Sequence, residues 1–333
     1  MSRFGLRLEY PVLLLFSMLL STAVFALELG LPAQCTIGKD CFVQQYPDMD
    51  AGPGASDPFC GSAAYDGHDG TDLRVLSMAD VARGVPVLAM ADGTVLRSRD
   101  GVPDHLVETE ADRAAVADKE CGNGMIVDHG GGFETQYCHL RQGSIVVKPG
   151  DAVKRGQKLG EIGASGLAQF PHVHVTVRRD GKAIDPATGH ELSAGCLKSG
   201  ETAQPVFAPE IVAALEKGEA QLIAFGLAGA PVDHTALSVS GPPSQATAAS
   251  PAFVGWGWFI NLRAGDRVVV RLFGPDGSEI AISRSDPMDR AKADYSAFAG
   301  KKGSPKPGAY TVSVAVERGG GVLFERSGTY LIE

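Results

Sequence analysis

Hydrophobic and polar residues alternate along several short stretches of the chain, and glycine-rich turns separate these stretches. Residues 172–178 alternate histidine, threonine and arginine with valine, and a period of two is typical of a β-strand. Residues 125–129 and 133–139 are two more strand-like runs that flank the three glycines at 130–132. We expect a hairpin across these glycines, and a second one at the Asp-Gly pair 180–181.

Two further stretches of the N-terminal half also give local predictions. Residues 85–97 contain two strand-like runs that meet at Asp92 and Gly93, which predicts another hairpin. Residues 98–120 are polar and charged, and we interpret them as a loop insertion. The alanine-rich piece at residues 111–117 predicts a short helix within that insertion.

The pattern changes after residue 196. Residues 197–250 contain a predicted helix that begins at Pro209, followed by a proline-rich linker. Strand-like alternation then resumes in residues 256–262, 265–273 and 308–317. We expect a β-sandwich over residues 251–333, so the chain as a whole is predicted to be mainly β.

The N-terminus carries an export signal. Arg3 and Arg7 precede an apolar run of 15 residues that ends in small residues at Ala26, which is typical of a cleaved signal peptide over residues 1–26. The alternative is an uncleaved membrane anchor, but the run is shorter than the roughly 17 to 25 residues that a spanning helix needs. We therefore expect an exported protein with no stable membrane span after cleavage.

Composition narrows the function classes. The chain of 333 residues has a formal net charge of −9 and a hydrophobic fraction of 44%, which is enough apolar sequence for packed cores. An acidic protein is a poor match for the phosphate backbone, so we expect no nucleic-acid partner. Nothing in the sequence indicates an oligomeric state.

Six cysteines lie beyond the predicted signal peptide. An even number in an exported chain indicates disulfides, and the absence of a C-x-x-C pair argues against cysteine-bound zinc. The sequence leaves many connectivities open. Our preferred pairs are Cys35–Cys41, which are close in sequence, and Cys121–Cys138, which can face each other across the glycine hairpin. Cys60 and Cys196 then remain as the third pair.

Histidines and one aspartate form the candidate site. His68 and Asp72 lie four residues apart, His172 and His174 lie two apart, and His139 lies between these clusters. A catalytic zinc ion takes three protein ligands from such residue types and keeps a fourth position open. His68, Asp72 and one histidine of the later pair would complete that set. Residues two apart on a strand point to the same face, so His172 and His174 can both reach this site. The histidines that do not bind the metal are then available for proton transfer.

These motifs resemble the lysostaphin-type (LytM-like) zinc endopeptidases, a family that cuts peptidoglycan peptides. The family pattern H-x-x-x-D, Tyr-x-His-Leu and H-x-H occurs here in that order, and the resemblance covers about residues 60–190. It implies His68, Asp72 and His174 as ligands of one zinc ion per chain. It implies His139 and His172 as catalytic histidines beside the metal.

The same resemblance implies an antiparallel β-sheet catalytic domain with the metal in an open groove. The chain departs from the family at residues 167–171, where relatives often carry Ser-Thr-Gly-Pro, and at the insertion 98–120. Asp69 and His129 are interpreted as turn residues. The expected organisation is a signal peptide (1–26), a disulfide-pinned segment (27–60), a zinc endopeptidase domain (61–196), a helix and linker (197–250) and a β-sandwich (251–333).

The expected function is that of a periplasmic or secreted zinc metalloendopeptidase that hydrolyses peptide cross-links or stem peptides of peptidoglycan. Two alternatives remain open. One is a non-enzymatic protein of the bacterial envelope that binds peptidoglycan or activates an amidase. The other is a secreted zinc endopeptidase that cleaves proteins.

Overall fold

The computed structural model describes Met1 and residues 27–215 and 218–333. The predicted signal peptide, Met1 aside, lies outside the described residues. Within the described residues, no helix is both long enough and apolar enough to cross a bilayer.

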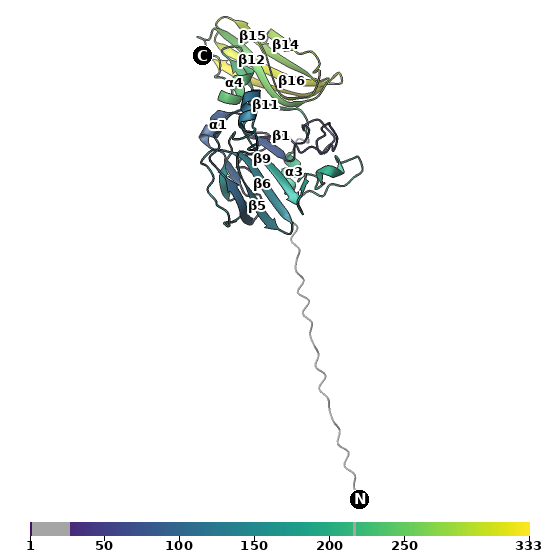
Figure 1. Ribbon diagram of the computed structural model, residues 1–333. Coiled ribbons are helices and arrows are strands. Elements are labelled where there is room, and N and C mark those ends of the chain that lie inside the picture. The colour runs from purple at the N-terminus through teal and green to yellow at the C-terminus, as the bar shows by residue number, and fades with distance from the viewer. Residues whose placement is uncertain (2–26, 216–217) are drawn as a thin grey trace.

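An antiparallel sheet of eight strands forms the first β region (Figure 1). Its strand order is β1-β2-β9-β6-β5-β4-β7, and β10 also pairs with β9. The strands are β1 (Phe42–Gln45), β2 (Thr71–Arg74), β4 (Gly93–Arg99), β5 (Asn123–Gly130), β6 (Phe133–Leu140), β7 (Ala152–Val153), β9 (His172–Arg179) and β10 (Lys182–Ile184). The predicted hairpins at the three glycines and at residues 180–181 are confirmed as β5–β6 and β9–β10.

The hairpin predicted for residues 85–97 is wrong. β3 (Pro86–Leu88) pairs with β8 (Lys158–Glu161) in a separate two-stranded sheet, whereas β4 pairs with β5 and β7. The Asp-Gly pair therefore lets the chain change sheets, because both strands find partners that are remote in sequence. The helix predicted inside the insertion is confirmed as α2 (Glu110–Ala115), and α1 (Met78–Arg83) follows β2.

Two further sheets form the C-terminal β region. One has the order β11-β12-β15 and the other β14-β13-β16-β17. Their bounds are β11 (Gln221–Ala228), β12 (Ala252–Leu262), β13 (Arg267–Phe273), β14 (Glu279–Arg284), β15 (Lys292–Lys302), β16 (Gly308–Arg318) and β17 (Gly321–Ile332). Buried side chains from both sheets, among them Phe259, Val270 and Val314, belong to one hydrophobic cluster.

The segment expected to be a helix and linker holds more structure than its sequence indicated. After the single-turn helix η1 (Leu192–Ala194), helix α3 (Pro209–Ala214) begins at the predicted proline and α4 (His234–Ser240) follows later. Between them, β11 pairs with β12 along most of its length. Residues 221–228 are therefore part of the C-terminal sheets.

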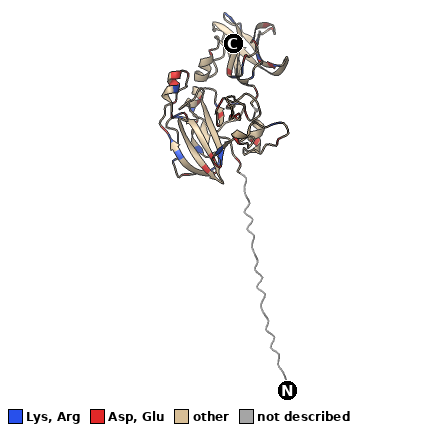
Figure 2. Cartoon of the chain, turned by 45° about the vertical axis from the view of Figure 1, so that its right-hand side comes forward, with Lys and Arg blue, Asp and Glu red and all other residues tan. Residues whose placement is uncertain are grey.

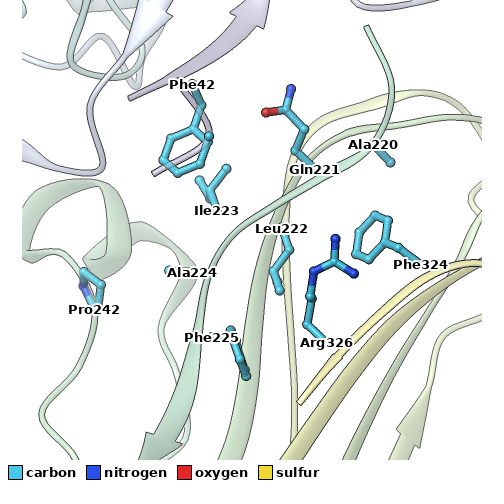
Figure 3. A pocket seen from close by; sticks show the side chains of 11 residues that line it. Phe42, Ala220, Gln221, Leu222, Ile223, Ala224, Phe225, Pro242, Phe324 and Arg326 are labelled. Atoms are coloured by element: carbon cyan, nitrogen blue, oxygen red, sulfur yellow. The ribbon is translucent and has the colours of Figure 1, made fainter. Parts of the chain in front are cut away.

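A small apolar cluster joins the two β regions. Phe42 of β1 packs with Ile223 of β11 and with Trp256 and Trp258 of β12, and α1 packs beside α4 (Figure 1). Figure 3 shows Phe42 and Ile223 facing a cavity of about 490 Å³ at this junction. Both tryptophans are buried in this cluster, as is common for large aromatic side chains.

Three disulfides brace the structure, and they are the preferred pairs Cys35–Cys41, Cys60–Cys196 and Cys121–Cys138. Cys60–Cys196 closes a loop of 136 residues around the first region. Lysine and arginine residues are scattered over the described parts of the cartoon (Figure 2).

Candidate metal centre

Strand register brings the candidate side chains to the middle of the eight-stranded sheet. β2 and β9 pair so that Asp72 lies opposite His174 and Arg74 lies opposite His172. β6 lies on the other side of β9, with Cys138 opposite His174, and this places His139 at the end of that pairing. His68 precedes β2. Three segments that are remote in sequence therefore meet here: residues 68–74, β6 and β9.

His68, Asp72 and His174 converge on one point. Nε2 of His68 lies 3.1 Å from Oδ1 of Asp72 and 3.1 Å from Nδ1 of His174. Nδ1 of His174 lies 2.9 Å from the same Asp72 oxygen. All three side chains are buried. Three ligand atoms this close can hold one metal ion between them.

The outer nitrogens of these imidazoles are already engaged. Nδ1 of His68 lies 2.7 Å from the carbonyl oxygen of Tyr46, and Nε2 of His174 lies 3.1 Å from Oδ1 of Asp69. Each outer nitrogen can donate its hydrogen to these oxygens, and the inner nitrogen then faces the other ligand atoms. Metal-binding histidines typically have such outer partners. Two imidazoles and a carboxylate therefore fit a zinc ion in donor type and orientation, and metal binding would displace a proton from an inner nitrogen.

Asp69 contacts the candidate site, which the sequence analysis did not predict because it interpreted this residue as a turn residue. Its carboxylate accepts a hydrogen bond from Nε2 of His174. It also lies 3.3 Å from the hydroxyl of Thr176 and 3.6 Å from the guanidinium of Arg178. These three partners are alternate residues of β9, so they share one face. That alternation was visible in the sequence and could have indicated a carboxylate partner for the strand.

His139 and His172 lie beside the three converging side chains. Their ring centroids are 4.5 Å apart, and His139 lies 6.0 Å from the ring of His174. Nδ1 of His139 donates to the carbonyl of Ser165 at 2.8 Å, and Nδ1 of His172 donates to that of Phe170 at 2.7 Å. In both rings Nε2 is the nitrogen left to accept a proton.

The backbone of His139 is held in an unusual conformation. Its φ angle is +62°, in the left-handed region that non-glycine residues seldom adopt. Its amide donates to the carbonyl of Cys121 at 2.8 Å, and Cys121 is bonded to the neighbouring Cys138. The disulfide therefore helps to fix the direction in which His139 points.

Burial and neighbouring charges set the protonation of the site. Burial lowers the pKa of His139 well below its ordinary value, and nearby His172 and His174 lower it further. Burial also lowers the pKa of His172. For His174 burial acts in the same direction, but hydrogen bonds to Asp69 and Asp72 outweigh it and raise the pKa to about 9. His139 and His172 are thus neutral near pH 7 and able to take up a proton.

A cavity of about 170 Å³ opens onto the site. His68, His139 and His174 line it, whereas Asp72 and His172 are not among its lining residues. The exposed ring of Tyr65 stacks on His68 with centroids 4.5 Å apart and forms part of the rim. The open side of the cluster is therefore the side that His139 faces.

Comparison with known proteins supports this assignment. Residues 66–186 match the model of Peptidase family M23. Peptidoglycan DD-endopeptidase ShyA of Vibrio cholerae is 28% identical over 137 residues, or 41% of this chain and 26% of that protein. Cell division protein DipM of Caulobacter vibrioides is 32% identical over 126 residues, or 36% of this chain and 17% of that protein.

A solved zinc-containing peptidase from Vibrio cholerae is 27% identical, with a TM-score of 0.28 over 44% of this chain and 39% of the other. The chain thus spans about a quarter or less of the length of the two curated relatives. The similarity is concentrated in the segment that holds the converging histidines and aspartate. Residues 66–186 of the chain belong to Peptidase family M23 (lysostaphin/LytM-like).

Proposed function

We propose that the protein is an exported zinc metalloendopeptidase that hydrolyses peptide cross-links or stem peptides of peptidoglycan. The observation that carries the proposal is the convergence of His68, Asp72 and His174, with the outer nitrogens of both histidines already hydrogen-bonded. The name of the relative ShyA supplies the substrate class. The three disulfides agree with a location in the bacterial envelope, periplasmic or secreted.

His68, Asp72 and His174 would hold one zinc ion per chain. When bound, zinc polarises a peptide carbonyl and lowers the pKa of water towards neutrality. His139 lines the cavity and is neutral, so its Nε2 would accept the proton of the attacking water and later return it to the leaving amine.

His172 would support His139 from a position that does not line the cavity. It lies outside the cavity, 4.5 Å from His139 between ring centroids, with its Nε2 3.5 Å from Asp72. From this place it would limit the movement of the His139 ring and keep the pKa of that ring low, so that His139 readily gives up the proton it has accepted. The sequence could not divide these tasks, whereas the position of each ring relative to the cavity favours this division.

The remaining parts of the chain would support this centre. We propose that the two C-terminal sheets form a β-sandwich, because both contribute to one hydrophobic cluster. We propose the boundaries 27–60, 61–196, 197–250 and 251–333 for the mature chain. Across these boundaries, β1 of the first segment joins the sheet of the second, and β11 of the third segment joins a sheet of the fourth.

Incubation of the purified protein with isolated sacculi tests the proposal. We expect soluble muropeptides whose masses identify a cleaved peptide bond, and we expect a chelator to abolish their release and added zinc to restore it. A loosely folded protein such as casein is the parallel substrate, and cleavage of casein with intact sacculi would assign the protein to the protein-cleaving alternative.

A second candidate function is that of a non-enzymatic envelope protein. The relative DipM is named for cell division and not for peptidase activity. This candidate predicts that the protein binds zinc and sacculi but releases no muropeptides. It also predicts that His139→Ala has no effect on any measured property apart from stability.

A further inference from the structure

A third cavity, of about 620 Å³ and distinct from the junction cavity beside Phe42, lies between the two β regions. Its walls come from the loops around Tyr65 and Phe170 on one side, and from α4 and the start of β15 on the other. Tyr65 also lines the cavity at the metal centre. The two cavities therefore share a wall, and a ligand that fills both passes across the ring of Tyr65.

Aromatic contacts connect this interregion cavity to the candidate site. Phe170 lines the cavity, and its ring lies 4.4 Å from that of His172. Tyr65 lines the cavity and stacks on His68. A ligand in the interregion cavity is therefore separated from the site histidines by only one layer of aromatic rings.

Arg74 fixes the floor between the two regions. This fully buried guanidinium donates to Asp294 of β15 at 3.1 Å and to Gln44 of β1. It also lies over the ring of Phe170 at 5.2 Å and over that of Trp258 at 4.7 Å. A desolvated ion pair with cation–π contacts on both sides holds the walls of the cavity in a preformed arrangement.

The lining suits an uncharged, hydroxyl-rich ligand. Ser62, Gln169, Thr235 and Ser238 offer groups that both donate and accept hydrogen bonds, and Tyr65 offers an exposed aromatic face. The titratable groups that line it are the carboxylates of Glu108 and Asp294 and the imidazole of His234, and none of the described lining residues is lysine or arginine. Asp294 is paired with Arg74 and lies 3.8 Å from His234, so a ligand that carries carboxylates would meet the unpaired charge of Glu108 and no lysine or arginine side chain among the lining residues.

This deepens the proposed function and rests on it: we propose that the interregion cavity is a subsite for the glycan strand of peptidoglycan, while the peptide enters the metal centre. Stem peptides carry free carboxylates, which the acidic lining disfavours. N-acetylated amino sugars are uncharged, carry hydroxyl and amide groups, and have apolar faces that stack on aromatic rings. The C-terminal region would then select peptides that are still attached to their glycan.

Direct binding of a β-1,4-linked N-acetylglucosamine tetramer, measured by calorimetry, tests the proposal. Ser238 lines the cavity from α4, whereas Ser240 of the same helix does not. We expect saturable binding by the wild type, about tenfold weaker binding by Ser238→Trp, and wild-type binding by Ser240→Trp. Thr235→Trp is a second variant from the same wall, with the same expected loss.

Thermal unfolding and zinc content of each variant separate a blocked cavity from a misfolded protein. A free stem tetrapeptide is the competing probe, and we expect it to leave tetramer binding unchanged. The proposal is overturned if the tetramer does not bind, if folded Ser238→Trp and Thr235→Trp bind it normally, or if the tetrapeptide displaces it. Binding needs no hydrolysis, so tetramer binding without muropeptide release would refute only the proposed activity.

Discussion

The two β regions bury different kinds of side chain. In the first region, β2 and β9 bury two facing pairs of charged or titratable residues, Asp72 with His174 and Arg74 with His172. In the C-terminal region, the facing positions of β13 and β16 are mainly valine, as at Val270 and Val314. Burying a polar group costs free energy unless it has a partner. In the first region, hydrogen bonds between the buried polar side chains, such as that between Asp72 and His174, offset this cost. The candidate metal site therefore lies in the first region and not in the apolar core of the second.

The largest expected effect comes from Asp72→Ala, which removes the carboxylate that touches both converging histidines. We expect loss of zinc and a hydrolysis rate below about a thousandth of the wild-type rate, because several kcal/mol of transition-state stabilisation disappear with the metal. Metal analysis and muropeptide release measure both changes. His174→Ala should behave in the same way. Asp289→Ala, at an exposed position of the C-terminal region, is the control and should retain both properties.

His139→Ala should separate chemistry from metal binding. We expect normal zinc content and a turnover lower by about a hundredfold or more, as for the loss of a general base. His105→Ala is the control, because His105 is exposed and pairs only with Asp112 of α2. A His139→Ala variant with near-normal turnover would rule out the catalytic role assigned to this ring.

Asp69→Asn should weaken the site without removing a ligand. The carboxylate orients His174 and increases its basicity, and loss of such a partner typically lowers metal affinity by about 10- to 100-fold. Competition with a zinc chelator measures the affinity. Unchanged affinity would show that Thr176 or solvent can replace Asp69, and that its proximity to His174 has no role in metal binding.

Val314→Ala tests the apolar core of the C-terminal region. Val314 is fully buried in the C-terminal cluster, and removal of two methyl groups should lower the free energy of unfolding by about 2 kcal/mol. Urea unfolding measures this loss. Zinc affinity should not change, and if it did, the two regions would be energetically coupled more strongly than their separate cores indicate.

Asp185 gives the smallest effect, a dependence of stability on pH. Burial raises the pKa of this carboxyl to about 6 despite hydrogen bonds from Thr188. The folded state therefore favours the protonated form. Its contribution to stability is greatest below the unfolded pKa and is lost as the pH rises through about 6, which amounts to about 1 kcal/mol between pH 5 and pH 7. Urea midpoints at these pH values should differ less in Asp185→Asn than in the wild type.

Local signals in the sequence were sufficient for the parts of the fold that form between neighbours. The glycines at 130–132 and the Asp-Gly pair at 180–181 mark real hairpins, and all three preferred disulfides are present. The Asp-Gly pair at 92–93 carries the same signal but lies between strands of different sheets. The partners of these strands lie farther along the chain, as for Val87 with Gly160 and Thr94 with Asp128, and turn chemistry does not encode them.

The same division applies to the candidate site. Motif spacing indicated which histidines and which aspartate to bring together, and the structure places them in contact; their roles stay predictions. Spacing did not show that Asp69 supports His174 or that Tyr65 borders two cavities. β1 and β11 were also missed, because each pairs with a strand beyond a predicted segment boundary, β1 with β2 across residue 60 and β11 with β12 across residue 250.

The bond between Cys60 and Cys196 encloses all five site side chains in one covalent loop. A protease that cuts once inside this loop, for example at the exposed Asp100 and Gly101, would leave two pieces that remain tethered. Such nicked protein would migrate as a single band on a gel run without reductant. Samples of this protein should therefore be judged for integrity only after reduction, or clipped and intact molecules will be assayed as one population.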